Sequence, residues 1–274
     1  IDGDFGGGTD SAVRSFQVDR GDKASGRVDP VAWQAITGMP WPQLFERCLQ
    51  LTARFEGHGY KLIAGNFDGA GLTWGIIGFT LKHGVVQAIV SEVAARAPQL
   101  LVAAFGQRAD ELVETFRTLK GAALLEWADS VSTGARKQTV IEPWRSGFAQ
   151  LGGEPLVQEI QRRRAREQYY DEAMATAVRL GSRAERDVAL CFDIHVQNGG
   201  VKAADQAAYR DAVAKSNGPK TAAGRREVLA LLVADSANRK YRADVLSRKS
   251  AIAVGQGVVH QQLFVLDNWG FASD

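Results

Sequence analysis

Cysteine, histidine and aromatic residues are scarce in this chain of 274 residues. It has 2 cysteines and 4 histidines, and aromatic residues make up 8% of it. Two cysteines are too few for a disulfide framework, and both lie in apolar helical patterns, so we expect Cys48 and Cys191 to be buried free thiols. No histidines or cysteines have the spacing of a zinc site, and we expect neither a metal nor a cofactor.

The chain also lacks a charge excess and long apolar runs. Its 33 Lys and Arg residues against 31 Asp and Glu residues leave a net charge of +2. A nucleic-acid binder usually carries a strong basic excess or stripe, so we expect no nucleic-acid partner. No stretch approaches the roughly 20 apolar residues that span a bilayer, so we expect no membrane insertion. A content of 45% hydrophobic and 23% charged residues is typical of a globular protein with a well-buried core.

The chain divides by composition into a short N-terminal unit and a long body. Residues 1–10 are rich in Gly and Asp and predict a loop, after which helical spacing begins. Asp29 and Pro30 have the N-cap and first-turn positions of a second helix. These features predict a small helical module over residues 1–37. Two prolines around Trp41 predict a linker over 38–43, and 44–274 form the body.

The body has mainly helical apolar spacing. Helices are predicted over 42–55, 85–97, 99–105, 108–119, 121–130, 155–180, 183–197, 203–216, 221–237 and 241–254. Residues 60–79 are rich in Gly, aromatic and β-branched residues and predict short strands and turns. A polar connection is expected at 132–144 and a loop at 255–274. The predicted fold class is mainly α, with one small β element near the start of the body.

A run of arginines lies in the predicted helix over 155–180. It comprises Arg162, Arg163, Arg164 and Arg166. Such a run could bind an anion, but charge runs on long helices are more often solvated faces, and we interpret it as one.

Two carboxylates and a hydroxyl in residues 55–79 suggest glycoside hydrolysis. Glu56 ends a predicted helix, Asp68 lies in a Gly-rich turn, and Thr73 follows five residues later. Glycosidases use one protonated carboxyl to donate to the leaving oxygen and one ionised carboxylate as base or nucleophile. A hydroxyl such as that of Thr73 can hold the attacking water. The spacing alone is weakly specific, because many pairs of exposed acids share it.

The same segment is similar to the active-site segment of lysozyme-superfamily glycosidases, and most closely to that of family 46 chitosanases. The residues that match in order are Tyr60, Asp68, Gly69, Gly71, Leu72, Thr73, Gly75, Ile76, Ile77, Gly78 and Phe79. The resemblance implies a two-lobed, lysozyme-like helical catalytic domain. It implies Glu56 as general acid, Asp68 as base or nucleophile, and Thr73 as the residue that orients water.

Departures from the chitosanase pattern are also present. Only three residues separate Glu56 from Tyr60, where the chitosanases have a longer insertion, and Ala70 replaces a usual Arg or Asp. Phe55, Glu56 and Gly57 are closer to the pattern of phage-type lysozymes. The sequence therefore lies between the two patterns.

Further site residues follow from looser matches. The resemblance implies a charge network that steadies the catalytic glutamate, formed by Asp193, Arg242 and Arg248. An ordinary buried salt bridge is the other interpretation of Asp193. The residues expected to contact substrate are Tyr60, His58, Asn66, Gln197 and Asn198. For Gln197 and Asn198, which lie at a predicted helix end, helix capping is the alternative.

The N-terminal unit resembles the second half of a peptidoglycan-binding type 1 module. The matching residues are Asp2, Gly3, Asp4, Phe5, Gly6, Thr9, Ala12, Val13, Phe16, Gln17, Gly26, Arg27, Val28, Asp29 and Trp33. This resemblance implies peptidoglycan glycan strands as the partner of the protein.

The combined prediction is a peptidoglycan hydrolase that cleaves the wall glycan by acid/base glycoside hydrolysis. The alternatives are a chitosanase and a non-catalytic wall-binding protein. Chitosan is polycationic and requires an acidic groove, so a chain of net charge +2 mildly favours peptidoglycan. We expect action on the cell wall, in the periplasm or outside the cell. The start shows no signal-peptide pattern, so delivery by phage lysis or a secretion system is expected.

Overall fold

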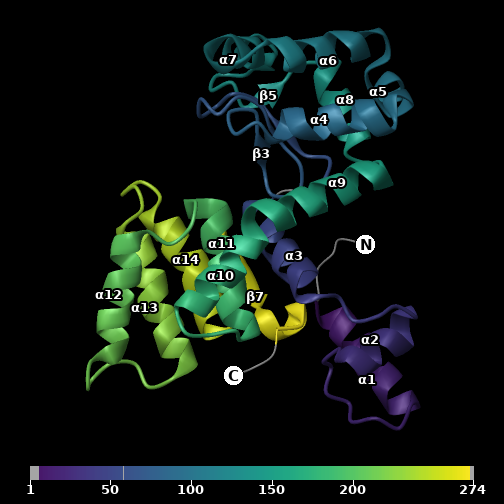
Figure 1. Cartoon of the computed structure of the whole chain (residues 1–274). Coiled ribbons are helices and arrows are strands. Elements are labelled where there is room, and N and C mark those ends of the chain that lie inside the picture. Colours follow the sequence, from purple (N-terminus) through teal and green to yellow (C-terminus); the bar gives the residue numbers. More distant parts are fainter. Residues whose placement is uncertain (1–5, 58, 272–274) are drawn as a thin grey trace. The chain divides into compact units, whose positions relative to one another are not determined.

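The computed structural model describes residues 6–57 and 59–271, and their contacts group into two compact units. One unit is Thr52–Gln168, called here the inserted unit; the other, the flanking unit, joins Ile1–Leu51 with Tyr169–Asp274. Both are mainly helical (Figure 1). The division differs from the module, linker and body predicted from the sequence, and those boundaries stay predictions.

The inserted unit surrounds a small antiparallel sheet with helices. The sheet has the order β1 (Ile63–Ala64), β2 (Thr73–Trp74) and β3 (Phe79–Thr80), and a hairpin joins β4 (Ser132–Thr133) to β5 (Thr139–Val140). The helices are α4 (Val85–Arg96), α5 (Pro98–Phe105), η1 (Gly106–Arg108), α6 (Ala109–Thr118), α7 (Gly121–Ser130), α8 (Trp144–Leu151) and α9 (Pro155–Ala165). Helix α3 (Leu44–Glu56) leads into this unit.

An aromatic cluster anchors the sheet of the inserted unit. Trp74 on β2 is fully buried, and its indole N–H donates to the Phe148 carbonyl over 3.1 Å. The two rings meet edge to face at 5.2 Å, and Phe105 packs on Phe148 at the same distance. Aromatic burial of this kind contributes roughly 2 to 3 kcal/mol for each ring, which fixes β2 against α8.

The flanking unit contains the remaining helices and a C-terminal hairpin. Its elements are α1 (Gly7–Asp19), α2 (Pro30–Thr37), η2 (Arg166–Tyr170, shared with the inserted unit), α10 (Asp171–Arg179), α11 (Glu185–Asn198), α12 (Ala203–Ala214), α13 (Ala222–Asp235), α14 (Arg242–Val254), β6 (Gln256–Val259), β7 (Gln262–Val265) and η3 (Leu266–Trp269). Helix α11 is buried from Arg186 to Ile194 with few exceptions. It packs against α10 and α14 (Figure 1).

Both cysteines are buried free thiols, as expected from the sequence. Burial raises the pKa of Cys191 to about 12, and it raises the pKa of Cys48 further still. Both thiols therefore stay protonated at neutral pH and act as small apolar side chains.

Two local expectations were wrong. Helix α1 begins at Gly7, inside the segment expected to be a loop. Residues 256–265 form the β6–β7 hairpin, where a loop was expected. The helix predicted over 155–180 is present, as α9 and α10 joined without a break by the π-helical turn η2.

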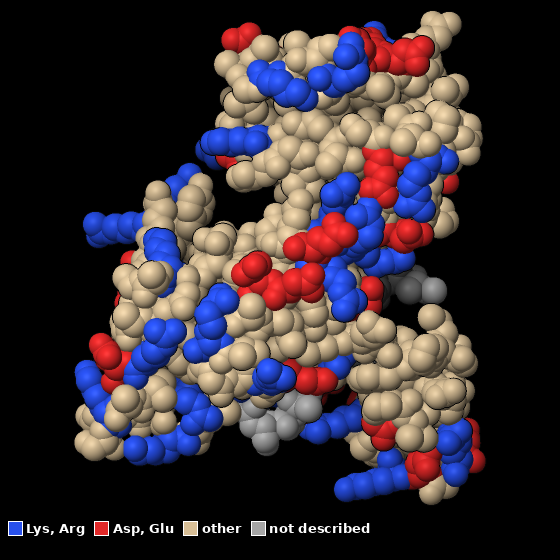
Figure 2. Space-filling model, in the orientation of Figure 1, with Lys and Arg blue, Asp and Glu red and all other residues tan. Residues whose placement is uncertain are grey.

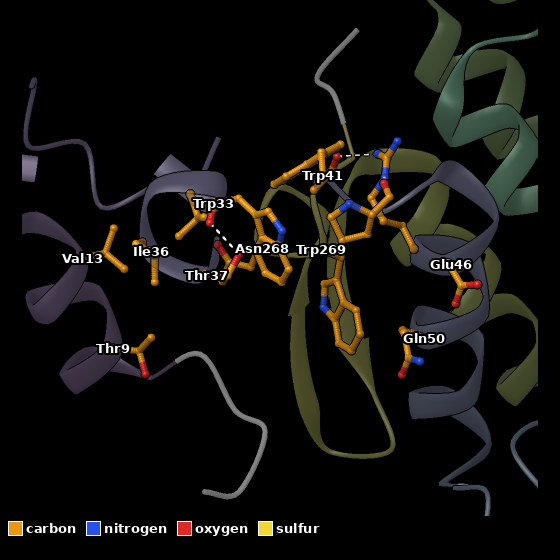
Figure 3. Close-up of a pocket in the computed structure, with 14 residues that line it drawn as sticks. Thr9, Val13, Trp33, Ile36, Thr37, Trp41, Glu46, Gln50, Asn268 and Trp269 are labelled. Atoms are coloured by element: carbon orange, nitrogen blue, oxygen red, sulfur yellow. Dashed lines mark hydrogen bonds between the residues drawn. The ribbon is translucent and has the colours of Figure 1, made fainter. Parts of the chain in front are cut away.

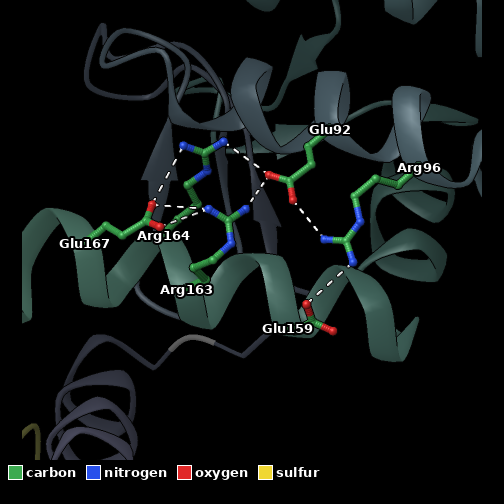
Figure 4. Close-up of polar contacts among 6 residues, drawn as sticks. All are labelled: Glu92, Arg96, Glu159, Arg163, Arg164 and Glu167. Atoms are coloured by element: carbon green, nitrogen blue, oxygen red, sulfur yellow. Dashed lines mark hydrogen bonds and ion pairs between the residues drawn. The ribbon is translucent and has the colours of Figure 1, made fainter.

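Two arginines of the run, Arg163 and Arg164 of α9, form ion pairs. Arg163 pairs with Glu92 of α4 and, over 3.0 Å, with Glu167, while Arg164 reaches Glu92 over 3.2 Å (Figure 4). Basic and acidic side chains are interleaved over α4 and α9 (Figure 2). Burial opposes ionisation of Glu92, but hydrogen bonds from Arg163 and Arg96 lower its pKa overall. Arg163 and Arg164 thus tie α9 to α4 through Glu92.

In the described part of the chain, no single helix is long and apolar enough to cross a membrane. Helix α4 and the stretch Pro98–Thr118 pass that test only as a pair bent by 114°.

Candidate active site

Asp68 lies in a tight loop that joins β1 to β2. Its carboxylate oxygen Oδ1 accepts a 3.0 Å hydrogen bond from the Ala70 backbone N–H. The Asn66 side-chain oxygen accepts from the Gly71 N–H over 2.9 Å and closes the loop. Gly69 and Gly71 have φ of +80° and +78°, which glycine adopts without strain. Asp68 is exposed to solvent. Its carboxylate is therefore accessible and is held by a defined turn.

Neighbouring elements hold this loop at both ends. The Asn66 N–H donates to the Ser132 hydroxyl over 2.9 Å, and the Ser132 hydroxyl donates to the Ala128 carbonyl over 2.6 Å. The Ala70 carbonyl accepts from the Lys82 N–H over 3.0 Å. The loop is thus positioned by α7 and β4 on one side and by the segment after β3 on the other. This role of Asn66 is structural; its predicted contact with substrate stays a prediction.

Thr73 occupies the central strand β2, where it is paired with Ala64 and Thr80. Its side chain is 7% exposed. No residue in the described part of the chain forms a hydrogen bond with its hydroxyl, although its backbone is fixed by the sheet. The hydroxyl therefore remains available as a donor and an acceptor.

Glu56 is the last residue of α3 and is half-buried. Phe55 before it is fully buried, and Gly57 after it has φ of +64°, which ends the helix. The apolar face of α3 thus fixes the backbone that carries the Glu56 carboxyl. His58, predicted to contact substrate, lies outside the described residues.

Gln161 braces the segment between Glu56 and the sheet, and sequence reasoning missed it. Its side chain on α9 is fully buried. Its Oε1 accepts from the Ile76 N–H over 3.0 Å, and its Nε2 donates to the Tyr60 carbonyl over 3.2 Å. It fits because Gly75, with φ of +91°, has no side chain to occupy the same space. The Tyr60 backbone is thereby fixed; the contact of its side chain with substrate stays a prediction.

In the flanking unit, Asp193 forms the centre of a buried charge cluster. Arg248 reaches Asp193 Oδ1 over 2.6 Å, and Lys249 reaches Oδ2 over 2.6 Å. All three side chains are at most 2% exposed. Burial opposes ionisation of Asp193, but the two cations and their hydrogen bonds outweigh it and lower its pKa to about 2. Asp193 is therefore an anion throughout the physiological range.

The cluster continues from Asp193 to the surface of the flanking unit. Lys249 also donates to the Gln197 side-chain oxygen, and Gln197 Nε2 donates to Asp244 over 2.7 Å. Asp244 pairs with His260 at the tip of the β6–β7 hairpin over 2.5 Å. Gln197 is thus engaged within the protein, and its predicted contact with sugar stays a prediction.

Two predicted residues of this unit are placed differently. Arg242 does not join Asp193: it pairs with Asp235 over 2.6 Å, on the surface. Its position in the first turn of α14 directs it away from the buried face, and Lys249 supplies the second cation instead. Asn198 ends α11, and its side-chain oxygen is buried without a hydrogen bond from any described residue.

The sequence contains one pattern that could have extended the cluster. Asp193 and Gln197 are four residues apart, so on a helix they share a face. Lys249 has no such pattern, because the sequence does not reveal that a lysine beside Ala251 and Ile252 is fully buried.

The N-terminal helices border a pocket of about 410 Å³ within the flanking unit (Figure 3). Tryptophan rings dominate it: Trp33 and Trp41 meet edge to face at 5.9 Å, and Trp269 faces the same space. The Trp33 indole N–H donates to the Pro40 carbonyl over 3.0 Å. The lining is mainly apolar, and Glu46 and Arg47 are its charged members.

Comparison with known proteins supports both resemblances. Residues 1–36 match the family described as a putative peptidoglycan binding domain. A search of curated proteins finds no match. A Gynuella sunshinyii family 46 chitosanase, solved in complex with chitotetraose, is 17% identical with a TM-score of 0.55, covering 82% of this chain and 98% of its own.

A second solved structure agrees. The native chitosanase from Bacillus subtilis MY002 is 18% identical with a TM-score of 0.54, covering 76% of this chain and 86% of its own. These likenesses confirm the predicted fold, which is mainly α and lysozyme-like.

Within the described residues, no group of three or more His, Cys, Asp or Glu side chains could hold a metal ion.

Proposed function

We propose that this protein is a peptidoglycan hydrolase that cleaves the glycan of the cell wall by glycoside hydrolysis. The single observation that carries the proposal is the Asp68 loop, which holds an exposed carboxylate and leads directly into β2, where Thr73 has an available hydroxyl. Glu56, half-buried at the end of α3, supplies the second carboxyl that the chemistry requires. The fold shared with chitosanases and the matched peptidoglycan-binding family support it.

In the proposed reaction, the carboxyl of Glu56 donates its proton to the glycosidic oxygen as the bond to the anomeric carbon breaks. The carboxylate of Asp68 either takes a proton from the water that attacks the anomeric carbon, or bonds to that carbon itself. In the second case water then displaces Asp68 from the anomeric carbon, and the Glu56 carboxylate takes the proton of that water and returns to its acid form. The Thr73 hydroxyl orients that water. The hydrogen bond from the Ala70 N–H fixes the position of the Asp68 carboxylate for either role.

The N-terminal residues supply attachment to the wall in this proposal. Residues 1–36 match a family described as binding peptidoglycan, so the protein would stay on its polymeric substrate between cleavages. Tethering of this kind raises the effective substrate concentration without new contacts in the active site.

The test is the Glu56→Gln variant, which keeps the size of the side chain and removes its acid. We expect it to fold normally and to release no soluble fragments from purified sacculi. Glu227→Gln, at an exposed position of α13, is the matched control and should cleave as the wild type does. Near-normal cleavage by Glu56→Gln would contradict the proposal.

Chitosan cleavage is the second candidate, favoured by the fold shared with two chitosanases. Mass spectrometry of the products separates the two activities. Muropeptides with a new reducing end support peptidoglycan hydrolysis. If glucosamine oligomers form from chitosan and nothing is released from peptidoglycan, the protein is a chitosanase instead.

A further inference from the structure

The inserted unit has a pocket of about 410 Å³ that the proposed catalytic residues do not use. Lys82 and Lys120 line it, and none of the described residues that line it is acidic. The Lys120 ammonium donates to the Phe116 carbonyl over 3.0 Å, which anchors the cation and leaves its other N–H groups for a ligand. The pocket is therefore cationic on a chain whose net charge is close to zero.

Two helices begin at the rim of this pocket. Gly84 precedes α4 and Lys120 precedes α7, and neither helix start has a side-chain cap. The N–H groups of a first helical turn have no partner within the helix and carry a partial positive charge. They add to the field of the two lysines and favour an anion in the same space.

Gln87 gives the pocket a hydrogen-bond acceptor, whereas the lysines and the helix starts supply donors. Its Nε2 donates to the Leu81 carbonyl over 2.8 Å, which fixes the orientation of the amide. Its Oε1 is buried and accepts no hydrogen bond from a described residue. A buried acceptor of this kind requires an N–H or O–H donor, which an anion alone does not supply. A ligand that carries both a carboxylate and a donor satisfies the whole set.

The pocket is contiguous with the loop that holds Asp68. Leu81 and Leu125 line the pocket, and their side chains lie 2.8 Å and 3.1 Å from the position that a Cβ on Gly71 would occupy. The Lys82 N–H donates to the Ala70 carbonyl, and the Ala70 N–H donates to Asp68. Leu81 and Lys82 therefore form a wall that the pocket shares with the Asp68 loop.

From this arrangement we infer that the pocket binds a carboxylate of the acyl substituents on the wall glycan, next to the bond to be cleaved. The inference rests on the proposed function and specifies its substrate class. Where muramic acid carries a peptide, its lactyl carboxyl is an amide, and the peptide supplies carboxylates together with amide N–H groups. Where the peptide is absent, the lactyl carboxylate itself is free. The charged substituents of chitosan are ammonium groups, which Lys82 and Lys120 would repel.

The test measures binding in the Glu56→Gln background, so that the ligand stays intact. The probes in calorimetric titration are soluble glycan strands with peptides, the same strands with the peptides removed by an amidase, and oligomers of N-acetylglucosamine. We expect Lys82→Ala with Lys120→Ala to weaken binding of carboxylate-bearing strands about 100-fold, or tenfold for each lysine. Binding of the N-acetylglucosamine oligomers should not change.

Lys215→Ala with Lys220→Ala is the matched control, because it removes the same charge from the flanking unit. It should bind every probe as the parent does. A loss confined to strands with peptides assigns the pocket to a peptide carboxylate, and a loss confined to the stripped strands assigns it to the free lactyl carboxylate. A loss on both strands shows that the pocket accepts either carboxylate. An equal loss with all three probes, no loss, or the same loss in the control overturns the inference.

The proposed function fails separately, through cleavage by the otherwise unchanged protein. If the protein releases nothing from sacculi but binds carboxylate-bearing strands through Lys82 and Lys120, the inference about the pocket stands and the proposed hydrolase activity is wrong. If the protein cleaves sacculi equally well with and without the two lysines, the proposed hydrolase activity stands and the inference about the pocket is wrong.

Discussion

The Lys249 ammonium lies 2.6 Å from the carboxylate of Asp193, and neither side chain has any exposed surface. Taking two charges out of water costs several kcal/mol for each ion, and only close geometry and further hydrogen bonds offset that cost. Arg248 and Gln197 supply those hydrogen bonds on either side of the pair. The pair therefore depends on every member of its cluster.

Lys249→Met should destabilise the protein by about 3 kcal/mol. The substitution keeps the volume of the side chain but leaves Asp193 with one cation fewer and Gln197 without its donor, and breaking a buried pair from one side has a cost of this size. The free energy of unfolding in urea measures it.

Arg242→Met is the control for that substitution. Its pair with Asp235 is 45% and 58% exposed, and exposed pairs contribute about 0.5 kcal/mol. Equal losses in the two variants would show that the Asp193 cluster contributes no more than a surface pair.

Acid should lower the free energy of unfolding through Asp193 in a defined pH range. Its pKa is about 2 in the folded state against an ordinary 3.8, so the folded state favours the ionised form. The stabilisation is complete above pH 3.8 and is lost as the pH falls through 2, and it amounts to about 2 kcal/mol. The difference in unfolding free energy between the wild type and Asp193→Asn should therefore shrink from pH 5 to pH 2. A constant difference would contradict the pKa assigned to Asp193.

Gly75→Ala should cost more stability than Gly69→Ala. Both glycines have positive φ, +91° and +80°, so each alanine costs about 1 to 2 kcal/mol in backbone strain. A Cβ on Gly69 meets nothing, whereas one on Gly75 overlaps the Gln161 side chain and breaks its bond to the Ile76 N–H. We expect a further loss of about 2 kcal/mol from that broken bond. Equal unfolding free energies for the two variants would show that Gln161 does not hold this turn.

Most helices were predictable because their apolar spacing is regular and their ends are marked. Helix α2 illustrates this: Asp29 caps it through the Ala32 N–H over 2.8 Å, Pro30 starts it, and Gly38 ends it with φ of +70°. Each of these residues has the local geometry that its type prefers.

The β6–β7 hairpin was not predictable for the opposite reason. Its two-residue turn has φ of +49° at His260 and +68° at Gln261, positions where Asn or Gly is usual. The contact of His260 with Asp244 of α14 accompanies this conformation, and such a contact cannot be inferred from nearby sequence. The same limit applies to the site. The Asp68 loop follows from a local motif, whereas Gln161 reaches the Ile76 N–H from 85 residues away along the chain.

Thr73→Val should abolish most of the activity and leave the fold intact. Valine has nearly the same shape, and because no described residue hydrogen bonds the Thr73 hydroxyl, its removal should change the unfolding free energy by no more than about 0.5 kcal/mol. Loss of the group that orients the attacking water should lower the rate of sacculus cleavage about 100-fold. Thr73→Ser keeps the hydroxyl and should retain most of the rate, because the backbone of β2 is fixed by pairing on both sides. If valine and serine reduce cleavage equally, the methyl group of Thr73 matters rather than its hydroxyl, and the role proposed for it in holding water is wrong.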